Sequence, residues 1–386
     1  MDIAVGIGIL GCGTVGTAVA TRLLEERDAL IARAGASFTL HGIAIGNLTK
    51  PREAAIAPSL FTDDARALVD DPRIDIIVEC IGGTTLASEL VESALYSGRH
   101  VISANKDLLA TQGPRLHALA SARGSHLRYE AAVGSAIPVL RILSEALAGD
   151  RVEAVAGVLN GTCNFVLEAM ENGASYADAL AQAQALGYAE ADPRNDVEGI
   201  DTTHKLAVLA QLGFGVPLTT ARIASAGIAN ITQRDVARAQ MLDYHIRLVA
   251  AARRTDEGIA AEVAPLLVHA SHPFAQLHGP ENAITVIGRD SGALLLRGQG
   301  AGGNATASAV LGDIISTLRA IAERRTFLPL RQRAHGLAQA HATPLFDRLT
   351  RNRTLPRYAV WEDSILTAPV SPLLVAHSRP GKETLA

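Results

Sequence analysis

The sequence has little cysteine, little lysine and no strong excess of either charge. Its three cysteines, Cys12, Cys80 and Cys163, are an odd number and include no CxxC pair. This spacing argues against a disulfide framework or a zinc ribbon, and it favours a protein of the reducing cytoplasm. The net charge of -4 and the pI of about 6.3 show no excess of basic residues, so they argue against a nucleic-acid-binding protein.

One uncharged run, residues 3–21, is long enough to suggest a membrane helix or a signal peptide. The run contains five glycines, and no basic segment precedes it. Because each glycine would cost a helix about 1 kcal/mol, we interpret the run as a buried strand, a turn and a helix start, and we expect no membrane contact. The 386 residues correspond to about two to three domains, and an apolar content of 48% excludes a disordered chain.

Lysine is the scarcest charged residue, with four lysines against thirty-one arginines. A lysine amine can lose its proton when it is desolvated, whereas a guanidinium stays protonated in proteins. In a chain in which almost every basic residue is arginine, a lysine is therefore expected at positions that need an amine able to lose its proton. Lys106 and Lys205 become candidate catalytic residues on this ground, although chance survival of surface lysines explains the count equally well.

The hydrophobic pattern predicts an α/β fold with a Rossmann-type, doubly wound parallel sheet, followed by a second, mixed α/β domain. The expected boundaries are 1–137 for the first domain, 138–304 for the second domain, 305–325 for a helix that returns to the first, and 326–386 for a tail without a recognisable regulatory domain. Predicted strands are 3–10, 39–45, 75–79, 100–103, 127–132, 152–159, 259–268, 283–287 and 294–297. Predicted helices are 15–30, 86–97, 161–173, 175–186, one that begins near 201, and 305–325.

The first chemical motif is Gly11-x-Gly13-x-x-Gly16, which lies between a predicted strand and a predicted helix. Glycines at these points allow a tight turn and a close approach of the backbone to a pyrophosphate, whose charge the helix N-terminus binds. The alternative is a structural glycine-rich turn. The acidic residue expected after the second strand is missing, because Gly46 and Asn47 stand there. Lys50 and Arg52 could meet a 2′-phosphate, so we favour NADP with tolerance of NAD, unless both are solvated loop charges.

The second motif is a cluster of Glu190, Asp192, Asp196, Asp201 and Lys205. Asp201 and Lys205 are four residues apart and share one face of a helix. A surface ion pair is the common explanation of this spacing. A catalytic lysine beside carboxylates that hold an amino group is the alternative.

A third motif, Ser103-Ala-Asn-Lys106, ends a parallel strand at the edge where such sheets bind ligands. A helix N-cap at Ser103 or Asn105 explains it as well, and the two roles can coexist.

Seven segments in the right order resemble the homoserine dehydrogenase family over about residues 3–325. They are residues 11–16, 78–83, 101–106, 129–138, 159–164, 186–193 with 196–205, and 300–308. The resemblance implies NAD(P)-dependent interconversion of L-homoserine and L-aspartate 4-semialdehyde in threonine, methionine and isoleucine biosynthesis. It also implies a homodimer, with 1–137 as the NAD(P)-binding domain and 138–304 as the domain for substrate binding, catalysis and dimerisation.

In the family the lysine matching Lys205 is the proton donor and acceptor, Asp201 supports it, and Lys106 lies near nicotinamide and substrate. Glu190 with Asp196 would hold the substrate ammonium. The substrate-binding residues so expected are Glu190, Asp196, Asp201, Gly161 and Thr162. The cofactor-binding residues so expected are Gly11, Gly13, Thr14, Val15, Gly16, Asn47, Lys50, Gly82, Ser103, Lys106 and Gly302.

The resemblance further implies a sodium or other monovalent cation held mainly by backbone carbonyls of Glu130, Val133, Ser135 and Ile137. Ser135 and Ala136 stand where the family usually has glycines, and Cys163 replaces a usual threonine. Two alternatives to this function stay open on the sequence. One is an NAD(P) dehydrogenase of another amino or hydroxy acid, and the other is a non-catalytic protein that senses a dinucleotide.

Overall fold

A computed structural model describes residues 4–50, 56–323, 351–352 and 355–361 of the chain. Its first part is a six-stranded parallel sheet in the order β3-β2-β1-β4-β5-β6, which is the Rossmann order. The strands are β1 (Ala4–Leu10), β2 (Ser37–Ala44), β3 (Phe61–Thr62), β4 (Ile76–Glu79), β5 (His100–Ser103) and β6 (Leu127–Arg128). The helices of this part are α1 (Thr14–Glu25), α2 (Arg27–Ala34), α3 (Ala65–Asp70), α4 (Leu86–Tyr96) and α5 (Lys106–Arg123).

The carboxyl ends of three central strands meet at one edge of this sheet. Leu10 of β1 pairs with Glu79 of β4, and Glu79 pairs in turn with Ser103 of β5. The loops that follow these strands therefore lie side by side. They carry the glycine-rich turn, Gly82 and Lys106.

The second part is an eight-stranded mixed sheet in the order β12-β11-β7-β9-β10-β14-β13, with β8 paired to β10. Its strands are β7 (Val152–Val158), β8 (Ala224–Ser225), β9 (Tyr244–Thr255), β10 (Gly258–His269), β11 (Glu281–Gly288), β12 (Gly292–Gln299), β13 (Arg351–Asn352) and β14 (Leu355–Trp361). Its helices are α6 (Val139–Arg141), α7 (Gly161–Glu171), α8 (Tyr176–Ala185), α9 (Arg194–Val197), α10 (Ile200–Phe214) and α11 (Gln233–Gln240). Short 3₁₀ or π turns cover Pro58–Leu60, Glu130–Ala132, Ile142–Ala146 and Thr220–Arg222.

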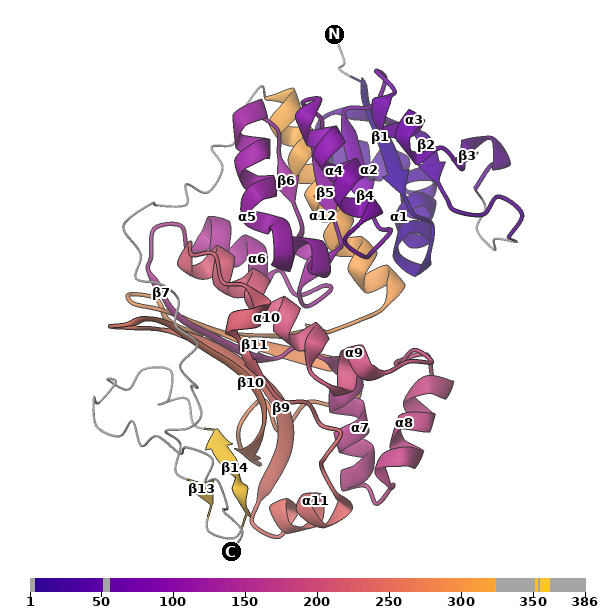
Figure 1. The fold of residues 1–386 in the computed structure, drawn as a ribbon. Helices are drawn as coiled ribbons and strands as arrows, with labels where there is room; N and C mark the ends of the chain where they lie inside the picture. Colours follow the sequence, from indigo (N-terminus) through magenta and orange to yellow (C-terminus); the bar gives the residue numbers. More distant parts are fainter. Residues whose placement is uncertain (1–3, 51–55, 324–350, 353–354, 362–386) are drawn as a thin grey trace, which may run out of the picture.

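Two helices join the parts. Figure 1 shows α10 between the two sheets and α12 (Gly303–Ala322), in orange, returning from the second sheet to the first. Helix α12 is long and apolar enough to cross a membrane, but half of its most apolar stretch of 18 residues is buried inside the protein. Its residues Ala307, Val310, Ile314 and Leu318 are at most 1% exposed and join the core of β1 and α1. We interpret it as a core helix.

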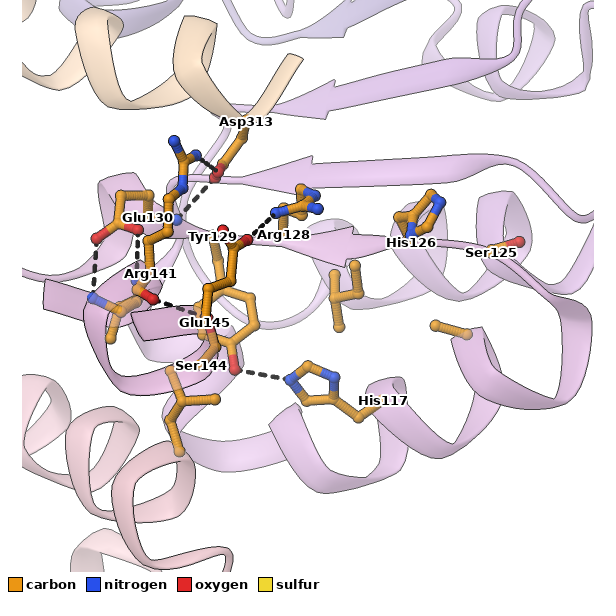
Figure 2. A pocket seen from close by; sticks show the side chains of 14 residues that line it. His117, Ser125, His126, Arg128, Tyr129, Glu130, Arg141, Ser144, Glu145 and Asp313 are labelled. Carbon is orange, nitrogen blue, oxygen red and sulfur yellow. Dashed lines mark hydrogen bonds and ion pairs between the residues drawn. The ribbon is translucent and has the colours of Figure 1, made fainter. Parts of the chain in front are cut away.

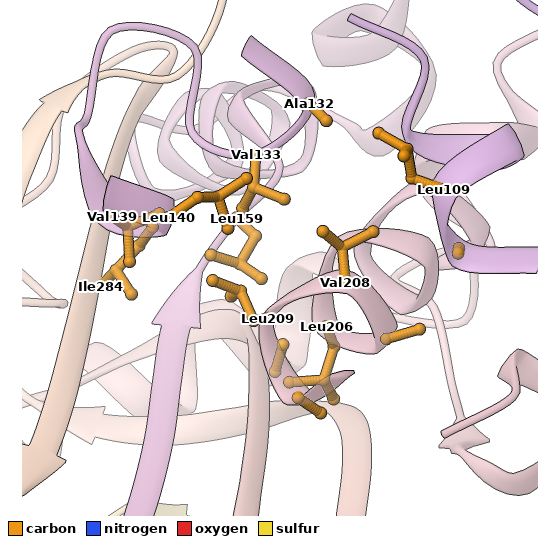
Figure 3. Close-up of a cluster of buried hydrophobic side chains, with 14 of the residues drawn as sticks. Leu109, Ala132, Val133, Val139, Leu140, Leu159, Leu206, Val208, Leu209 and Ile284 are labelled. Atoms are coloured by element: carbon orange, nitrogen blue, oxygen red, sulfur yellow. The ribbon is translucent and has the colours of Figure 1, made fainter. Parts of the chain in front are cut away.

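One hydrophobic cluster runs through both parts. Figure 3 shows Leu109 of α5, Leu206 of α10 and Ile284 of β11 among the side chains of this cluster. Because burial of such side chains is the main stabilising term in folding, the shared core holds α5 and α10 at a set spacing. The candidate site lies where these two helices begin.

The structure differs from the sequence-based expectations in several elements. The predicted helix 15–30 is two helices, because Glu26 leaves helical geometry and ends α1. Strand β9 was missed, since its Ala250–Ala252 stretch has low strand propensity and is strand only because it is buried at the sheet centre. Helices α9 and α11 were missed too, although the Thr232–Asp235 capping box signals the start of α11.

Most of the tail, 326–386, lies outside the described residues, and its described part is strand, which the sequence did not predict. Strand β14 extends the sheet beside β10, and Trp361 is buried against Phe274. The tail therefore contributes to the second sheet.

Candidate active site

The two scarce lysines meet at one carboxylate. Lys205 and Asp201 lie one turn apart on α10, with Lys205 Nζ 2.7 Å from Asp201 Oδ2. Lys106, the first residue of α5, places its Nζ 3.2 Å from Asp201 Oδ1. The side chain of Asp201 is 9% exposed, and that of Lys205 is 12% exposed. This is not the solvated ion pair that the spacing alone most often means.

The two ammonium groups keep Asp201 ionised. Burial opposes the charge of Asp201, but the charges of Lys205 and Lys106 and their hydrogen bonds outweigh it and lower the pKa of Asp201 to about 2. Burial lowers the pKa of Lys106, but the charges of Asp201 and Asp107 and the hydrogen bond to Asp201 outweigh it, so that the pKa of Lys106 is raised. The site therefore contains a permanent anion between two amines.

Lys205 Nζ has a second fixed partner, since it donates to the carbonyl of Leu159 at 2.8 Å. Leu159 directly follows β7, so strand β7 and helix α10 together orient the amine. Asp201 and Leu159 use two of the tetrahedral positions on the nitrogen. One position is left, and Lys205 lines the cavity beside it.

Asn160 joins the acidic residues into one group. Its Nδ2 donates to Asp196 Oδ1 at 2.7 Å and to Asp201 Oδ2 at 2.9 Å, while its Oδ1 caps α7 through Cys163 N. Burial raises the pKa of Asp196, the Asn160 hydrogen bond opposes this, and the charge of Asp201 adds to it. Sequence reasoning missed Asn160 as a site residue, although an N-cap asparagine directly after a buried strand was a usable signal.

A cavity of about 780 Å³ opens beside this group. Of the predicted substrate residues, it brings together the following: Gly161, Thr162, Glu190, Asp196 and Asp201. Glu190 is exposed, whereas Thr162 is buried and donates to the carbonyl of Tyr188 at 2.6 Å. Asp192 also lines the cavity but forms an exposed pair with Arg194, so it does not belong to the buried group.

The glycine turn after β1 has the geometry of a pyrophosphate-binding loop. Gly11 has φ +96°, and a Cβ at Gly16 would lie 2.1 Å from the carbonyl oxygen of Gly11. A Cβ at Gly13 would meet nothing within 4 Å, so the space there is open to a ligand. Thr14 and Val15 start α1, whose N-terminal amides face this turn. These residues fit a dinucleotide.

Other predicted cofactor residues surround the same edge of the sheet. Gly302 lines the 780 Å³ cavity, and a Cβ at the next residue, Gly303, would lie 2.9 Å from the Thr14 side chain. Gly82, with φ +79°, lies in the loop that follows β4, and Ser103 is the last residue of β5. Asn47 accepts hydrogen bonds from Thr49 in an exposed turn after β2 that also carries Lys50. Arg52 lies outside the described residues.

Comparison with known proteins identifies the arrangement. Residues 11–130 match the model of the homoserine dehydrogenase NAD-binding domain, and residues 138–315 match that of homoserine dehydrogenase. The homoserine dehydrogenase of Corynebacterium glutamicum is 45% identical over 322 residues, which are 82% of this chain and 72% of that protein. The chain belongs to the homoserine dehydrogenase family.

Solved structures of homoserine dehydrogenases agree. The enzyme from Thiobacillus denitrificans superposes with a TM-score of 0.83 at 39% identity, covering 89% of this chain and 80% of the other. A hyperthermophilic archaeal homoserine dehydrogenase in complex with NADPH gives a TM-score of 0.68 at 26% identity, covering 82% and 98%. The chain is thus a homoserine dehydrogenase, an NAD(P)-dependent oxidoreductase, as its sequence predicted.

In this homoserine dehydrogenase the predicted cation loop is buried and strained. Ser135 has φ +53°, the left-handed conformation that glycine adopts without cost, and its hydroxyl lies 2.8 Å from that of Thr306. Ser135 therefore keeps the backbone shape of a glycine turn. The carbonyl of Ile137 accepts from Val139 N, but no donor among the described residues reaches the buried carbonyls of Val133 and Ser135.

The carboxylate of Glu130 is engaged elsewhere, as Figure 2 shows. It accepts from the backbone amides of Leu140 and Arg141 at 2.9 and 2.8 Å, while Asp313 of α12 accepts from Glu130 N. Burial and the charge of Asp313 raise the pKa of Glu130 to about 7, against the two amide hydrogen bonds. These residues line a second, smaller cavity of about 140 Å³ that contains none of the predicted catalytic side chains.

Two further groups next to the site were not assigned a role from the sequence. His204 points away from the cavity and its Nδ1 lies 2.5 Å from Asp107 Oδ1, which links α10 to α5. Cys163 is fully buried, and burial raises the pKa of its thiol, so it acts as a small core residue at this position.

Proposed function

We propose that this enzyme interconverts L-homoserine and L-aspartate 4-semialdehyde with Lys205 as the group that exchanges the hydroxyl proton. The observation that carries this assignment is the double anchoring of Lys205 Nζ by Asp201 and the Leu159 carbonyl. In the neutral amine these two acceptors take both N–H groups, and the lone pair occupies the remaining tetrahedral position. In the ammonium form the same position carries the third proton, which is the form needed for aldehyde reduction.

The acidic residues suit a substrate with an amino group. Asp196 is half-buried and Glu190 is exposed at the rim of the same cavity, so the ammonium of homoserine would find anionic oxygens on one side. Asp201 is committed to the two lysines and serves to orient them. Lys106, on the cofactor side of Asp201, would bind substrate near the nicotinamide.

The glycine turn, Gly82, Ser103 and Gly302 would hold NAD(P), which when bound supplies the hydride acceptor or donor. We favour NADP over NAD because an exposed turn with Asn47 and Lys50 follows β2 where an NAD-specific site has a carboxylate. The NADPH complex of the archaeal relative supports this preference.

We also propose a sodium ion or another monovalent cation at the loop of Glu130, Val133, Ser135 and Ile137. The buried carbonyls of Val133 and Ser135 support the site, since buried carbonyls normally have a partner and hard cations take oxygen ligands. No group of three His, Cys, Asp or Glu side chains in the described chain could hold a metal, so the cation would rest on backbone oxygens.

Two proposals concern the assembled protein. A homodimer is supported by β12, which is the edge of the second sheet and exposes 47% of Leu295. A cytoplasmic location is supported by the three free cysteines. Light scattering on the purified enzyme tests the dimer.

Initial rates test the function. Homoserine should be oxidised with NADP and with NAD, and the reaction should be faster with NADP or reach half its maximal rate at a lower cofactor concentration. The rate should also be higher with sodium than with choline as the cation of the buffer. A panel of other amino and hydroxy acids serves as the control. Turnover of another acid in preference to homoserine, or cofactor binding without any turnover, would overturn the proposal.

A further inference from the structure

Glu79 is a buried carboxylate without a cation. It ends β4 and is 0% exposed. No lysine, arginine or histidine of the described chain forms an ion pair with it. An isolated buried carboxylate is costly unless hydrogen bonds compensate it, so its position needs a reason.

Its hydrogen bonds come from two loops. Oε1 accepts from the backbone amides of Ile81 and Gly82 at 2.9 and 3.1 Å, both in the loop after β4. Oε2 accepts from the Ser103 hydroxyl at 2.6 Å, at the end of β5. One carboxylate thus ties the two loops that follow neighbouring strands at the ligand-binding edge.

Asn105 extends this connection to the catalytic group. Its Nδ2 donates to the carbonyl of Gly83 at 2.7 Å and lies 3.4 Å from Glu79 Oε1, while its Oδ1 caps α5 through Leu108 N. The Ser103 hydroxyl also accepts from Asn105 N at 3.1 Å. Helix α5 begins at Lys106, whose amine reaches Asp201.

The loop after β4 depends on this support. Gly82 and Gly83 both have positive φ, +79° and +70°, and neither would have a neighbour within 4 Å of an added Cβ. Among the residues described, side-chain contacts to this loop come from Glu79 and Asn105. Without them the loop would lose the acceptor of its Ile81 and Gly82 amides and the donor to its Gly83 carbonyl.

We propose that Glu79 is a positioning residue that sets the Gly82 loop and the start of α5 against each other, and through them the nicotinamide end of the cofactor and Lys106. It acts by accepting hydrogen bonds and not by its charge. The inference rests on the proposed binding of NAD(P) at this edge of the sheet.

The chemistry of Glu79 provides a way to separate hydrogen bonding from charge. Burial raises the pKa of Glu79, and the hydrogen bonds from Ser103, Gly82 and Ile81 oppose that rise. Glu79→Gln removes the charge but keeps one carbonyl oxygen for the two backbone amides, and its amide can donate to Ser103 Oγ. Glu79→Ala removes all of these acceptors.

The experiment measures the dissociation constant of NADPH by fluorescence, together with kcat and the KM for homoserine. Glu79→Ala should weaken NADPH binding at least tenfold and lower kcat. It should raise the KM for homoserine by a smaller factor, because Lys106 would be displaced whereas Glu190 and Asp196 lie on other elements. Glu79→Gln should restore NADPH binding to within about threefold of the wild type. Glu92→Ala is the matched control, since Glu92 of α4 accepts from Ser88 and Arg115 away from the loops and should change neither constant.

Equal loss in Glu79→Gln and Glu79→Ala would overturn the inference in favour of a charge effect, and unchanged NADPH binding in Glu79→Ala would overturn it outright. If Glu79→Ala does not fold, Glu79→Asp replaces it. That variant keeps a carboxylate but is one methylene shorter, so it would not reach the Ser103 hydroxyl and the two loop amides together. It should weaken NADPH binding severalfold, and wild-type binding there would contradict the proposal. Wild-type turnover of homoserine is measured in the same series, so that failure of the proposed function is seen independently of the variants.

Discussion

Replacing the Lys205 amine should separate catalysis from binding and folding. In Lys205→Met the side chain keeps its length and loses the amine. In Lys205→Arg it keeps a charge that cannot be given up at ordinary pH. General acid–base catalysis contributes about 10²- to 10⁴-fold to rate, so kcat should fall by that factor in both variants, which is about 3–5 kcal/mol in the activation barrier.

The structure predicts a small cost in stability for Lys205→Met. Asp201 would retain Lys106 at 3.2 Å and Asn160 at 2.9 Å, and the Leu159 carbonyl would retain Asn282 at 2.9 Å. Because no buried partner is left without a hydrogen bond, the free energy of unfolding should drop by about 1 kcal/mol. Cofactor affinity should stay within about threefold, since Lys205 lies on α10 and not on the glycine turn.

The assay combines initial rates, NADPH titration and urea unfolding, with Arg234→Lys on the surface of α11 as a control. Small primary amines added to Lys205→Ala should restore part of the rate if the missing group is a proton acceptor. A Lys205→Arg enzyme with more than about a tenth of wild-type kcat would refute the reasoning, because its guanidinium cannot accept the hydroxyl proton.

Three further predictions follow from the geometry. Gly13→Ala should leave the free energy of unfolding unchanged, because its Cβ meets nothing within 4 Å, but it should weaken NADPH binding about tenfold. Gly16→Ala should destabilise the fold, because its Cβ would lie 2.1 Å from the Gly11 oxygen. Unaltered NADPH affinity in Gly13→Ala would contradict the pyrophosphate assignment. Asp201→Asn should lower the free energy of unfolding by about 2 kcal/mol at neutral pH. The pKa of Asp201 is about 2 in the folded protein against 3.8 when unfolded, so its stabilising contribution is present above pH 4 and is lost as the pH falls towards 2. Denaturation at pH 7 and at pH 3 measures the loss in the variant, and an equal loss at both would contradict the prediction. The contribution of Glu130 to stability changes with pH in the opposite direction. Its pKa is about 7 in the folded protein against 4.5 when unfolded, so this contribution is fully present below pH 4.5 and falls by about 3 kcal/mol as the pH rises to about 7. Glu130→Gln should remove this pH dependence, which urea titrations in sodium-free buffer measure.

The sequence determined the parallel sheet and the ends of half of its strands. Apolar runs predicted β1, β4 and β5 within a residue of their observed ends, because a strand buried on both faces is mostly apolar. Strand β3 was not predicted, and the predicted strand 127–132 is too long, because β6 ends at Arg128. The glycine spacing likewise predicted the turn between β1 and α1, where neither Gly11 nor Gly16 has room for a Cβ. Composition and spacing made Lys106, Lys205 and the glycine turn candidate site residues, with alternatives left open, and the family resemblance added their roles and the cation loop.

The tertiary structure decided what the pattern could not. Strand β9 contains alanines and arginines that do not favour a strand by themselves. Arg247 is buried there because Glu171 of α7 lies 2.6 Å away and the carbonyl of Ala275 accepts from it at 3.0 Å. The contact of Lys106 with Asp201 joins residues far apart in the chain, and so do those of Asn160 with Asp196 and of Glu79 with Ser103. Local sequence carries propensity and periodicity, whereas contacts between residues far apart in the chain exist only once the chain has folded.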